Sequence, residues 1–228
     1  SLVLLVLGLF ACSGNRFEGK IIAVSQDPGT EGLEGAGLVL LDPEKAGQGA
    51  EALYGNFHSA ASPALSHDAR YLAFSAKENA GDPWQIWVAD LKKNKVSQVT
   101  DLKENCSFPA ILPDMSIVFT REGECCGTTT ADIWKCGIDG CCLTRLTYNP
   151  ANNRHAAVLW EGRILFLSSQ RYPEEKDPLL MVMKPDGVKA EVYTYGSGDL
   201  KPEGKGTEGP DGAIYFISTG GKLSRVMH

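Results

Sequence analysis

Cysteine is the residue type with the clearest chemical potential in this sequence. Seven cysteines are present; Cys12 stands alone, and six fall within 37 positions of one another, namely Cys106, Cys125, Cys126, Cys136, Cys141 and Cys142. Such a cluster can form disulfides, bind a metal or remain as buried thiols. Cys136 and Cys141 flank Gly-Ile-Asp-Gly, a spacing that would let them face each other across a hairpin.

The spacing of the six clustered cysteines favours disulfides. It does not match the two-residue ligand knuckles of zinc sites or the common iron–sulfur patterns. No Cys-x-x-Cys-His is present, which excludes covalent haem attachment. In an oxidising compartment paired cysteines become disulfides, and six cysteines allow 15 pairings. We predict disulfides within this set and no metal ligand or cofactor, with a cysteine-rich ligand- or metal-binding module as the open alternative.

Catalytic motifs are missing from the sequence. It contains no His-Glu-x-x-His, no Gly-x-Ser-x-Gly, no Walker loop and no Gly-x-Gly-x-x-Gly in a strand–helix setting. Of the four histidines, His155 begins a predicted innermost strand, where it would face either a partner or the protein's own hydrogen-bonding groups. We therefore predict no catalytic residue, and we treat His155 as a candidate for binding a partner.

The four tryptophans divide into two groups by position. Trp87 and Trp134 are 47 residues apart and occupy equivalent places in a repeat, which is typical of aromatic residues packed between sheets. Trp84 and Trp160 fall outside this register. Exposed tryptophans often anchor protein partners, so Trp84 and Trp160 are candidate partner-binding residues.

A repeat of about 47 residues organises the elements that carry these side chains. An apolar anchor recurs at Val24, Phe74, Phe119, Phe166 and Phe216, with steps of 50, 45, 47 and 50 residues. Two further landmarks recur at steps of 47: Ile86, Ile133 and Leu180 in the next strand, and Val99, Leu146 and Tyr193 in the one after it. Short strands repeated with this period are typical of a β-propeller, whose small sheets bury their faces by stacking. The sequence predicts an all-β fold of four-stranded antiparallel blades, about five in number.

The first and last repeats look incomplete. The N-terminal unit offers three strands, near 20–25, 38–41 and 52–54, without an inner strand. The C-terminal unit offers a clear strand at 213–218, a further one at 223–227, and a poorly formed inner strand within the Gly-, Lys- and Glu-rich 196–212. The expected ring is therefore either closed irregularly or lacks a segment of chain.

The N-terminus resembles a bacterial lipoprotein signal. Residues 2–11 are apolar without a break and are too few to cross a bilayer as a helix. Leu9-Phe10-Ala11-Cys12 resembles a lipobox, and the alternative is a buried apolar strand. We predict a partial signal peptide at 1–11, a link at 12–18 lipidated on Cys12, and propeller repeats at 19–228. This predicts export to the periplasm or cell surface, with a lipid anchor in the outer membrane.

Composition excludes one class of partner. The chain has 228 residues, a formal charge of −6 and scattered charged side chains without a basic stripe. Nucleic-acid binding is therefore not expected.

The repeat resembles a known family. Ser66 to Ser75, Ile86 to Asp90 and Val99-Thr100 resemble the WD40-like PD40 repeat of the TolB-type β-propellers, and Pro113-Asp114 to Thr120, Arg145 to Thr147 and Pro210 to Gly212 repeat its parts. The resemblance covers roughly residues 17–227. It implies a periplasmic or cell-surface propeller that binds other envelope proteins. Related propellers also occur in serine peptidases and polysaccharide-degrading enzymes, so the alternative is a propeller fragment of an exported peptidase or polysaccharide lyase.

Overall fold

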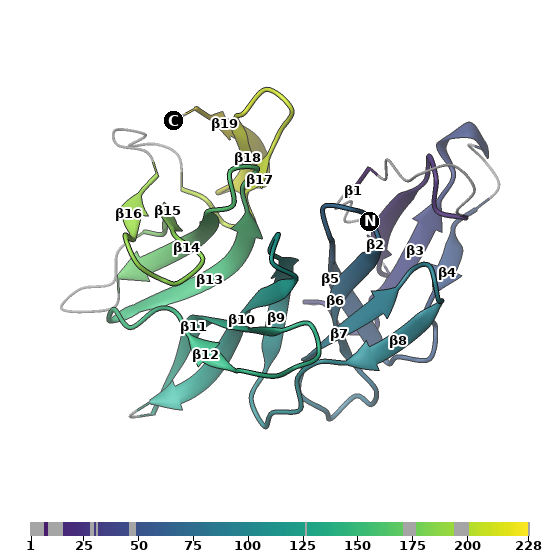
Figure 1. The fold of residues 1–228 in the computed structure, drawn as a ribbon, viewed down its shortest axis with the longest axis horizontal. Coiled ribbons are helices and arrows are strands. Elements are labelled where there is room, and N and C mark those ends of the chain that lie inside the picture. The colour runs from purple at the N-terminus through teal and green to yellow at the C-terminus, as the bar shows by residue number, and fades with distance from the viewer. Residues whose placement is uncertain are drawn as a thin grey trace. The chain divides into compact units, whose positions relative to one another are not determined.

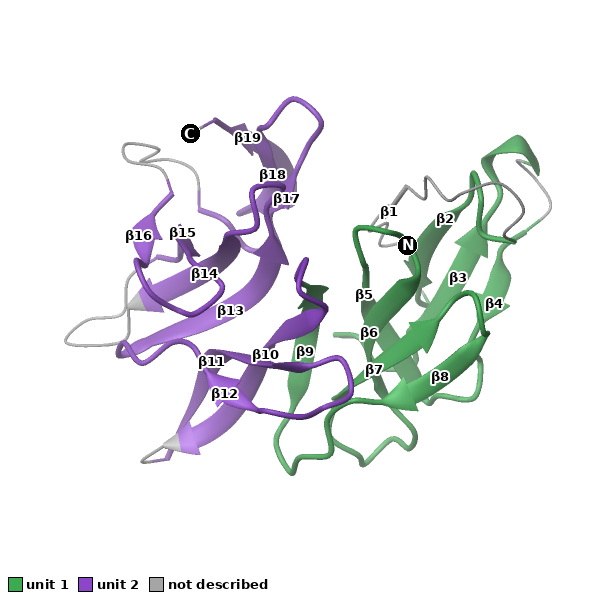
Figure 2. Cartoon of the chain, viewed as in Figure 1, with its two compact units in different colours: residues 1–111 green, residues 112–228 purple. Residues whose placement is uncertain are grey.

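The structure is a computed structural model, and it describes residues 7–8, 16–27, 30, 32–45, 49–125, 127–170, 177–193 and 201–227. The chain divides into two compact units, residues 1–111 and residues 112–228 (Figures 1 and 2). The described residues form antiparallel sheets and one short 3-10 helix, η1 (Pro43–Lys45). No helix among them is long and apolar enough to span a membrane.

Unit 1 contains two four-stranded sheets and one further strand. Neighbouring strands in each sheet are consecutive in sequence, as expected for a chain of hairpins. The first sheet comprises β1 (Leu7–Gly8), β2 (Ile21–Ser25), β3 (Gly37–Leu41) and β4 (Glu51–Leu53). The second comprises β5 (Ser59–Leu65), β6 (Tyr71–Lys77), β7 (Gln85–Asp90) and β8 (Lys95–Gln98), and β9 (Cys106–Ile111) follows.

Unit 2 continues the same pattern. It begins with β10 (Ser116–Cys125), β11 (Thr128–Gly137) and β12 (Thr144–Arg145). The next sheet is β13 (Ala151–Val158), β14 (Ile164–Gln170), β15 (Leu179–Met183) and β16 (Glu191–Val192). The last sheet has three described strands, β17 (Thr207–Glu208), β18 (Ile214–Ser218) and β19 (Lys222–Val226). The chain thus forms five sheets of the predicted blade type.

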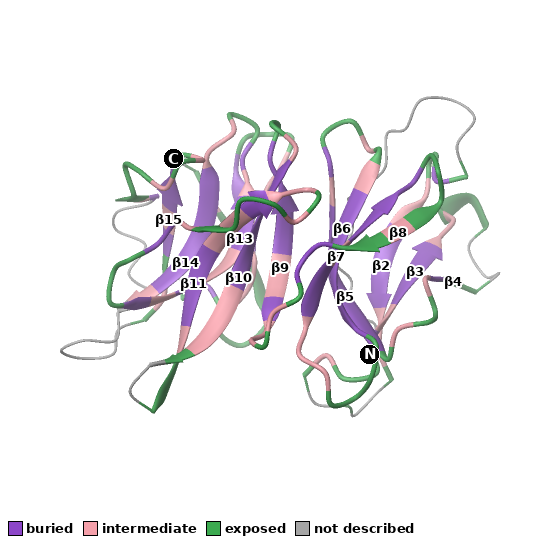
Figure 3. Ribbon diagram, turned by 60° about the horizontal axis from the view of Figure 1, so that its bottom comes forward, coloured by how far each residue is buried: buried purple, intermediate pink, exposed green. Residues whose placement is uncertain are grey.

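The apolar anchors of the repeat lie in the cores of the units. Phe74, Phe119, Phe166 and Phe216 are all between 0% and 3% exposed, as the sequence predicts. Both faces of β6 are covered, so six of its seven residues are buried, whereas the outer strand β8 has no buried residue (Figure 3). Because inner and central strands lie between layers, they carry the apolar residues and the outer strands carry the polar ones.

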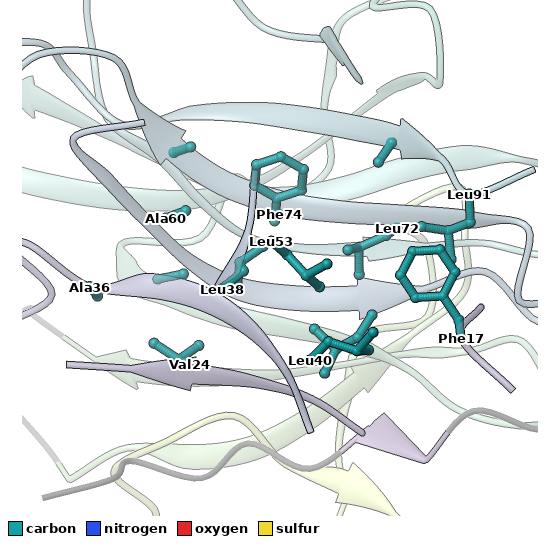
Figure 4. Packing of buried hydrophobic residues seen from close by; sticks show 14 residues of the cluster. Phe17, Val24, Ala36, Leu38, Leu40, Leu53, Ala60, Leu72, Phe74 and Leu91 are labelled. Atoms are coloured by element: carbon teal, nitrogen blue, oxygen red, sulfur yellow. The ribbon is translucent and has the colours of Figure 1, made fainter. Parts of the chain in front are cut away.

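The core of unit 1 joins its two sheets. Leu38 and Leu53 of the first sheet meet Leu72 and Phe74 of the second, with Phe17 at the end of the cluster (Figure 4). Each such side chain contributes on the order of 1.5–3 kcal/mol through its burial. The core of unit 2 is built in the same way from Leu165, Leu167, Leu180, Val182 and Phe216.

Aspartates fix the turns of the repeat. In the turns before β6, β10 and β18, the carboxylates of Asp68, Asp114 and Asp211 accept the backbone N–H two residues later at 3.0–3.1 Å. Asp139 and Asp186 do the same in two outer hairpins, at 3.1 Å. Aspartate favours such turns because its side chain replaces a backbone acceptor. This explains why Pro-Asp and Asp-Gly pairs mark the repeat in the sequence.

Two features differ from the sequence predictions. The first sheet has an inner strand after all, since Leu7 and Gly8 of β1 pair with Ile22 and Ile21. The segment predicted as a signal peptide therefore contributes two residues to a sheet, and its export role stays a prediction. The second difference is the extent of the outer strands: Val99, Leu146 and Tyr193 were expected within them, but β8, β12 and β16 end one residue earlier. In unit 2, β10 and β11 pair over ten residues from Ser116↔Gly137 to Cys125↔Thr128.

Candidate functional site

Trp160 is the most exposed of the predicted partner-binding residues. It lies in the turn between β13 and β14, and it is 76% exposed. The turn around it is closed by a backbone hydrogen bond from the Leu159 N–H to the Arg163 carbonyl at 2.9 Å. The backbone N–H of Trp160 also donates to Glu208 Oε2 of β17 at 2.6 Å. The indole is thus displayed to solvent on a fixed backbone.

Other large apolar side chains are exposed on the same unit. Among the described residues, those with substantial exposure all belong to unit 2, namely Leu143, Tyr148, Trp160, Leu179, Val188, Ile217, Leu223 and Met227. Ile217 and Leu223 are direct cross-strand neighbours on β18 and β19. Tyr148 lies beneath the guanidinium of Arg145, 5.0 Å from its ring centre. Single exposed apolar residues are ordinary, so these side chains do not by themselves define a contiguous patch.

Trp84 is held within unit 1 and is only partly accessible. Its backbone N–H donates to Asn105 Oδ1 at 3.0 Å, and the ammonium of Lys77 lies 5.3 Å from its ring centre. Lys77 is itself buried and pairs with Glu34, which also lies 3.4 Å from His58. The Lys77 contact lowers the pKa of Glu34. These contacts give Trp84 a packing role beside its predicted binding role.

His155 lies half-buried in a bulge of β13. The pairing of β13 with β14 shifts register between Arg154 and Ala157, and His155 has a φ of 59°. Burial lowers the pKa of His155 to about 4, and the charges of Arg154 and Lys205 act in the same direction. Burial likewise lowers the pKa of Lys205 to about 8. His155 is therefore neutral near pH 7.

The described cysteines separate into buried and exposed thiols. Cys106 and Cys136 are buried, whereas Cys141 and Cys142 are exposed in the hairpin between β11 and β12. Burial raises the pKa of Cys136 to about 12, and a hydrogen bond with Asp139 is the main cause that raises the pKa of Cys141 to about 11. Cys12, Cys126 and the side chain of Cys125 lie outside the described part, so the predicted disulfides and the lipidation of Cys12 stay predictions.

The structure contains a buried polar network around Asp132 that the sequence analysis did not predict. Asp132 of β11 accepts hydrogen bonds from Arg145 at 2.7 Å, Thr147 at 2.8 Å and Asn153 at 3.3 Å. Asn153 is fully buried and also accepts from the hydroxyl of Ser168 at 2.8 Å. In unit 1, Gln85 occupies the place 47 residues earlier and binds the backbone of Leu102 and Glu104. A polar residue before each Ile-Trp pair was the sequence feature that could have indicated it.

The described residues contain two modest cavities and no cluster suited to a metal. In unit 1, a cavity of about 220 Å³ is lined by residues that include Gln26, Asp27, Tyr54 and Phe57. A second one, also about 220 Å³, lies beside Lys20, Asp42 and Glu51. Within the described ranges, no three His, Cys, Asp or Glu side chains are arranged to hold a metal ion.

Comparisons with known proteins identify the fold. No family model matches the sequence, and neither does any curated protein. Solved structures do match: hydrazine synthase of Kuenenia stuttgartiensis at a TM-score of 0.71 and 19% identity, covering 85% of this chain and 34% of that one. TolB from Acinetobacter baumannii gives 0.65 and 21%, covering 92% and 50%.

Enzymes share the same fold. A puromycin-hydrolyzing peptidase of Mycobacterium tuberculosis gives a TM-score of 0.59 at 16% identity, covering 96% of this chain and 37% of that one. Oligogalacturonate lyases also match. The chain thus spans about a third to a half of the length of the three structures compared in full. At these identities the likeness concerns the fold, which is that of the TolB-type β-propellers.

Proposed function

We propose that this chain is the propeller of a non-catalytic envelope lipoprotein that binds another envelope protein. The predicted lipobox ending at Cys12 supports an anchor in the outer membrane, with the propeller in the periplasm or at the cell surface. The missing catalytic motifs support a binding role, and the shared fold with TolB is consistent with it.

The main observation in support of the proposal is the solvent exposure of the Trp160 side chain. A tryptophan that is 76% exposed costs solvation free energy in the isolated protein, and its backbone is held by Glu208. Tryptophan is among the residues that contribute most to protein–protein affinity when a partner buries them. Because its turn is already ordered, docking loses little backbone entropy. Trp160 is therefore the expected anchor.

The test places a photo-crosslinking amino acid at position 160 in the lipid-anchored protein in cells. We expect one discrete adduct with an envelope protein. In a direct binding assay with that protein, Trp160→Ala should weaken the affinity by at least tenfold, since a tryptophan hot spot is worth about 2 kcal/mol or more.

The matched control is Tyr148→Ala, which removes another aromatic side chain of unit 2, 72% exposed. It should leave the affinity within about threefold. Equal losses for both variants, or no adduct at position 160, would contradict the assignment of Trp160 as the anchor.

The alternative is a propeller that forms part of an exported peptidase or polysaccharide lyase. The observation in its favour is that enzyme structures match this chain over nearly all of its length while extending well beyond it. Labelling of the full-length protein by a serine-reactive fluorophosphonate, or turnover of oligogalacturonate, would favour this alternative over the scaffold.

A further inference from the structure

The exposed cysteine pair Cys141–Cys142 has no packing role that explains it. Free cysteine is among the most buried residue types. An exposed cysteine is usually retained for its reactivity and not for its packing. Cys106 and Cys136 follow that rule as core residues, but Cys141 and Cys142 are both exposed. Two adjacent thiols at the surface of a tight hairpin therefore point to a chemical use.

The hairpin fixes the backbone that carries the two adjacent thiols. Gly137 N–H donates to the carbonyl of Cys141 at 2.8 Å, and Gly140 N–H donates to the carbonyl of Gly137 at 2.9 Å. The Cys141 sulfur lies over Gly137, 2.9 Å from the place a Cβ would occupy, so this glycine makes room for it. The backbone N–H of Cys141 donates to Asp139 Oδ1 at 3.1 Å, which closes the turn on the same side.

The backbone at Cys142 is part of the hairpin design. Cys142 has a φ of 59°, Lys189 has a φ of 54° at the corresponding place 47 residues later, and Asn94 has a φ of 51° in the hairpin between β7 and β8. The left-handed residue is therefore set by the fold. Among these three hairpins, only the one between β11 and β12 has a thiol at that place, next to a second thiol.

A direct disulfide between neighbouring residues is disfavoured by geometry. Consecutive Cα atoms are 3.8 Å apart across a trans peptide, whereas disulfides usually join Cα atoms 4.4–6.8 Å apart. A strained disulfide is easily reduced. A single atom that bridges the two sulfurs avoids this constraint because it lengthens the connection between them.

We propose that Cys141 and Cys142 form a two-coordinate site for a soft monovalent cation, Cu(I). Thiolates are soft ligands that select Cu(I), whereas a structural zinc site requires four ligands. The described residues offer no third His, Cys, Asp or Glu arranged with the pair to hold a metal. On binding, two S–H bonds break, two S–Cu bonds form, and two protons pass to solvent. The copper remains in the +1 state, so no oxidant or reductant is consumed.

The test titrates the reduced full chain with Cu(I) under anaerobic conditions against a competing chromophoric chelator. The variant C141S/C142S should bind one equivalent less than the parent protein. The matched variant C125S/C126S removes the other adjacent pair and should leave that equivalent in place. Because Cys141 and Cys142 are exposed, the variant C141S/C142S should keep the parent melting temperature.

A second readout identifies the sulfurs directly. Cu(I) should protect Cys141 and Cys142 from alkylation by iodoacetamide, as seen by peptide mass spectrometry. Unchanged stoichiometry in C141S/C142S, or alkylation at equal rates with and without copper, overturns the proposal. A purified protein in which the two thiols are already joined to each other or to other cysteines, and remain so under mild reductant, also overturns it.

Discussion

The backbone N–H of His155 donates to Thr120 Oγ1 at 3.1 Å, which ties the bulge of β13 to strand β10 of the preceding sheet in unit 2. The same bond exists in unit 1, where Phe108 N–H donates to Ser75 Oγ at 3.1 Å. Phe108 and His155 both have positive φ, and Ser75 and Thr120 each follow the buried phenylalanine of their strand. The hydroxyl after the anchor phenylalanine thus satisfies a backbone donor that the bulge removes from its own ladder.

Replacing this hydroxyl should destabilise the unit. Thr120→Val keeps the shape but leaves the His155 N–H without its acceptor, which costs about 1–3 kcal/mol. Denaturant unfolding followed by tryptophan fluorescence measures the change. Thr129→Val, at an exposed position of β11, should change the free energy of unfolding by less than about 0.5 kcal/mol. Equal changes in the free energy of unfolding for the two variants would contradict a stabilising role of the hydrogen bond from His155 to Thr120.

The anchor phenylalanines should dominate the stability of the sheets. Phe119 is fully buried, so Phe119→Ala leaves a cavity and should lower the free energy of unfolding by about 3–5 kcal/mol. Phe119→Leu should lose less because it retains more of the volume. Calorimetric melting of both variants checks the order. A loss from Phe119→Leu as large as that from Phe119→Ala would show that the site is not close-packed.

The Asp132 network should matter more than any exposed ion pair. Asp132→Ala removes the acceptor of Arg145, Thr147 and Asn153 at a buried place, and a loss of about 3 kcal/mol is expected. Lys201→Ala breaks an ion pair with Asp177 in which both side chains are at least half exposed. That change should cost less than about 1 kcal/mol. Urea midpoints of the two variants, measured side by side, decide the point.

The sequence predicted the parts of this fold that repeat. Phe74 and Phe119 could be placed in the core from the sequence alone. A residue that packs between two sheets is apolar in each repeat and recurs at a regular spacing. Trp160 could be nominated because it falls outside that spacing, and it is exposed.

Pairings that depend on a neighbouring strand could not be predicted. Val99 and Leu146 were expected within strands, but β8 and β12 end before them and before the threonines that follow, Thr100 and Thr147. Their hydroxyls instead accept the backbone N–H groups of Ile86 and Ile133 at 2.8 and 3.0 Å. The bulge at His155 and the pairing of β1 depend in the same way on contacts between segments, which no local pattern records.

His155 should make the protein more sensitive to mild acid. Its pKa is about 4 in the folded state, against about 6.5 in the unfolded chain, so the unfolded state binds more protons between these values. Stability is therefore fully present above about pH 6.5 and falls as the pH drops towards 4. The loss approaches about 3 kcal/mol, because one pKa unit corresponds to 1.36 kcal/mol.

His155→Gln should flatten the dependence of stability on pH in this window. Arg154 and Lys205 are the charges that act on His155, and the pKa of Lys205, about 8, lies above the window from pH 4 to 6.5. Carboxylates with lowered pKa, such as Glu34 and Asp114, are present in both proteins and contribute equally to both slopes. His67→Gln, at an exposed turn, is the control and should keep the parent slope. If the His155 variant also keeps that slope, or if NMR shows His155 titrating near 6.5, burial does not hold this imidazole neutral.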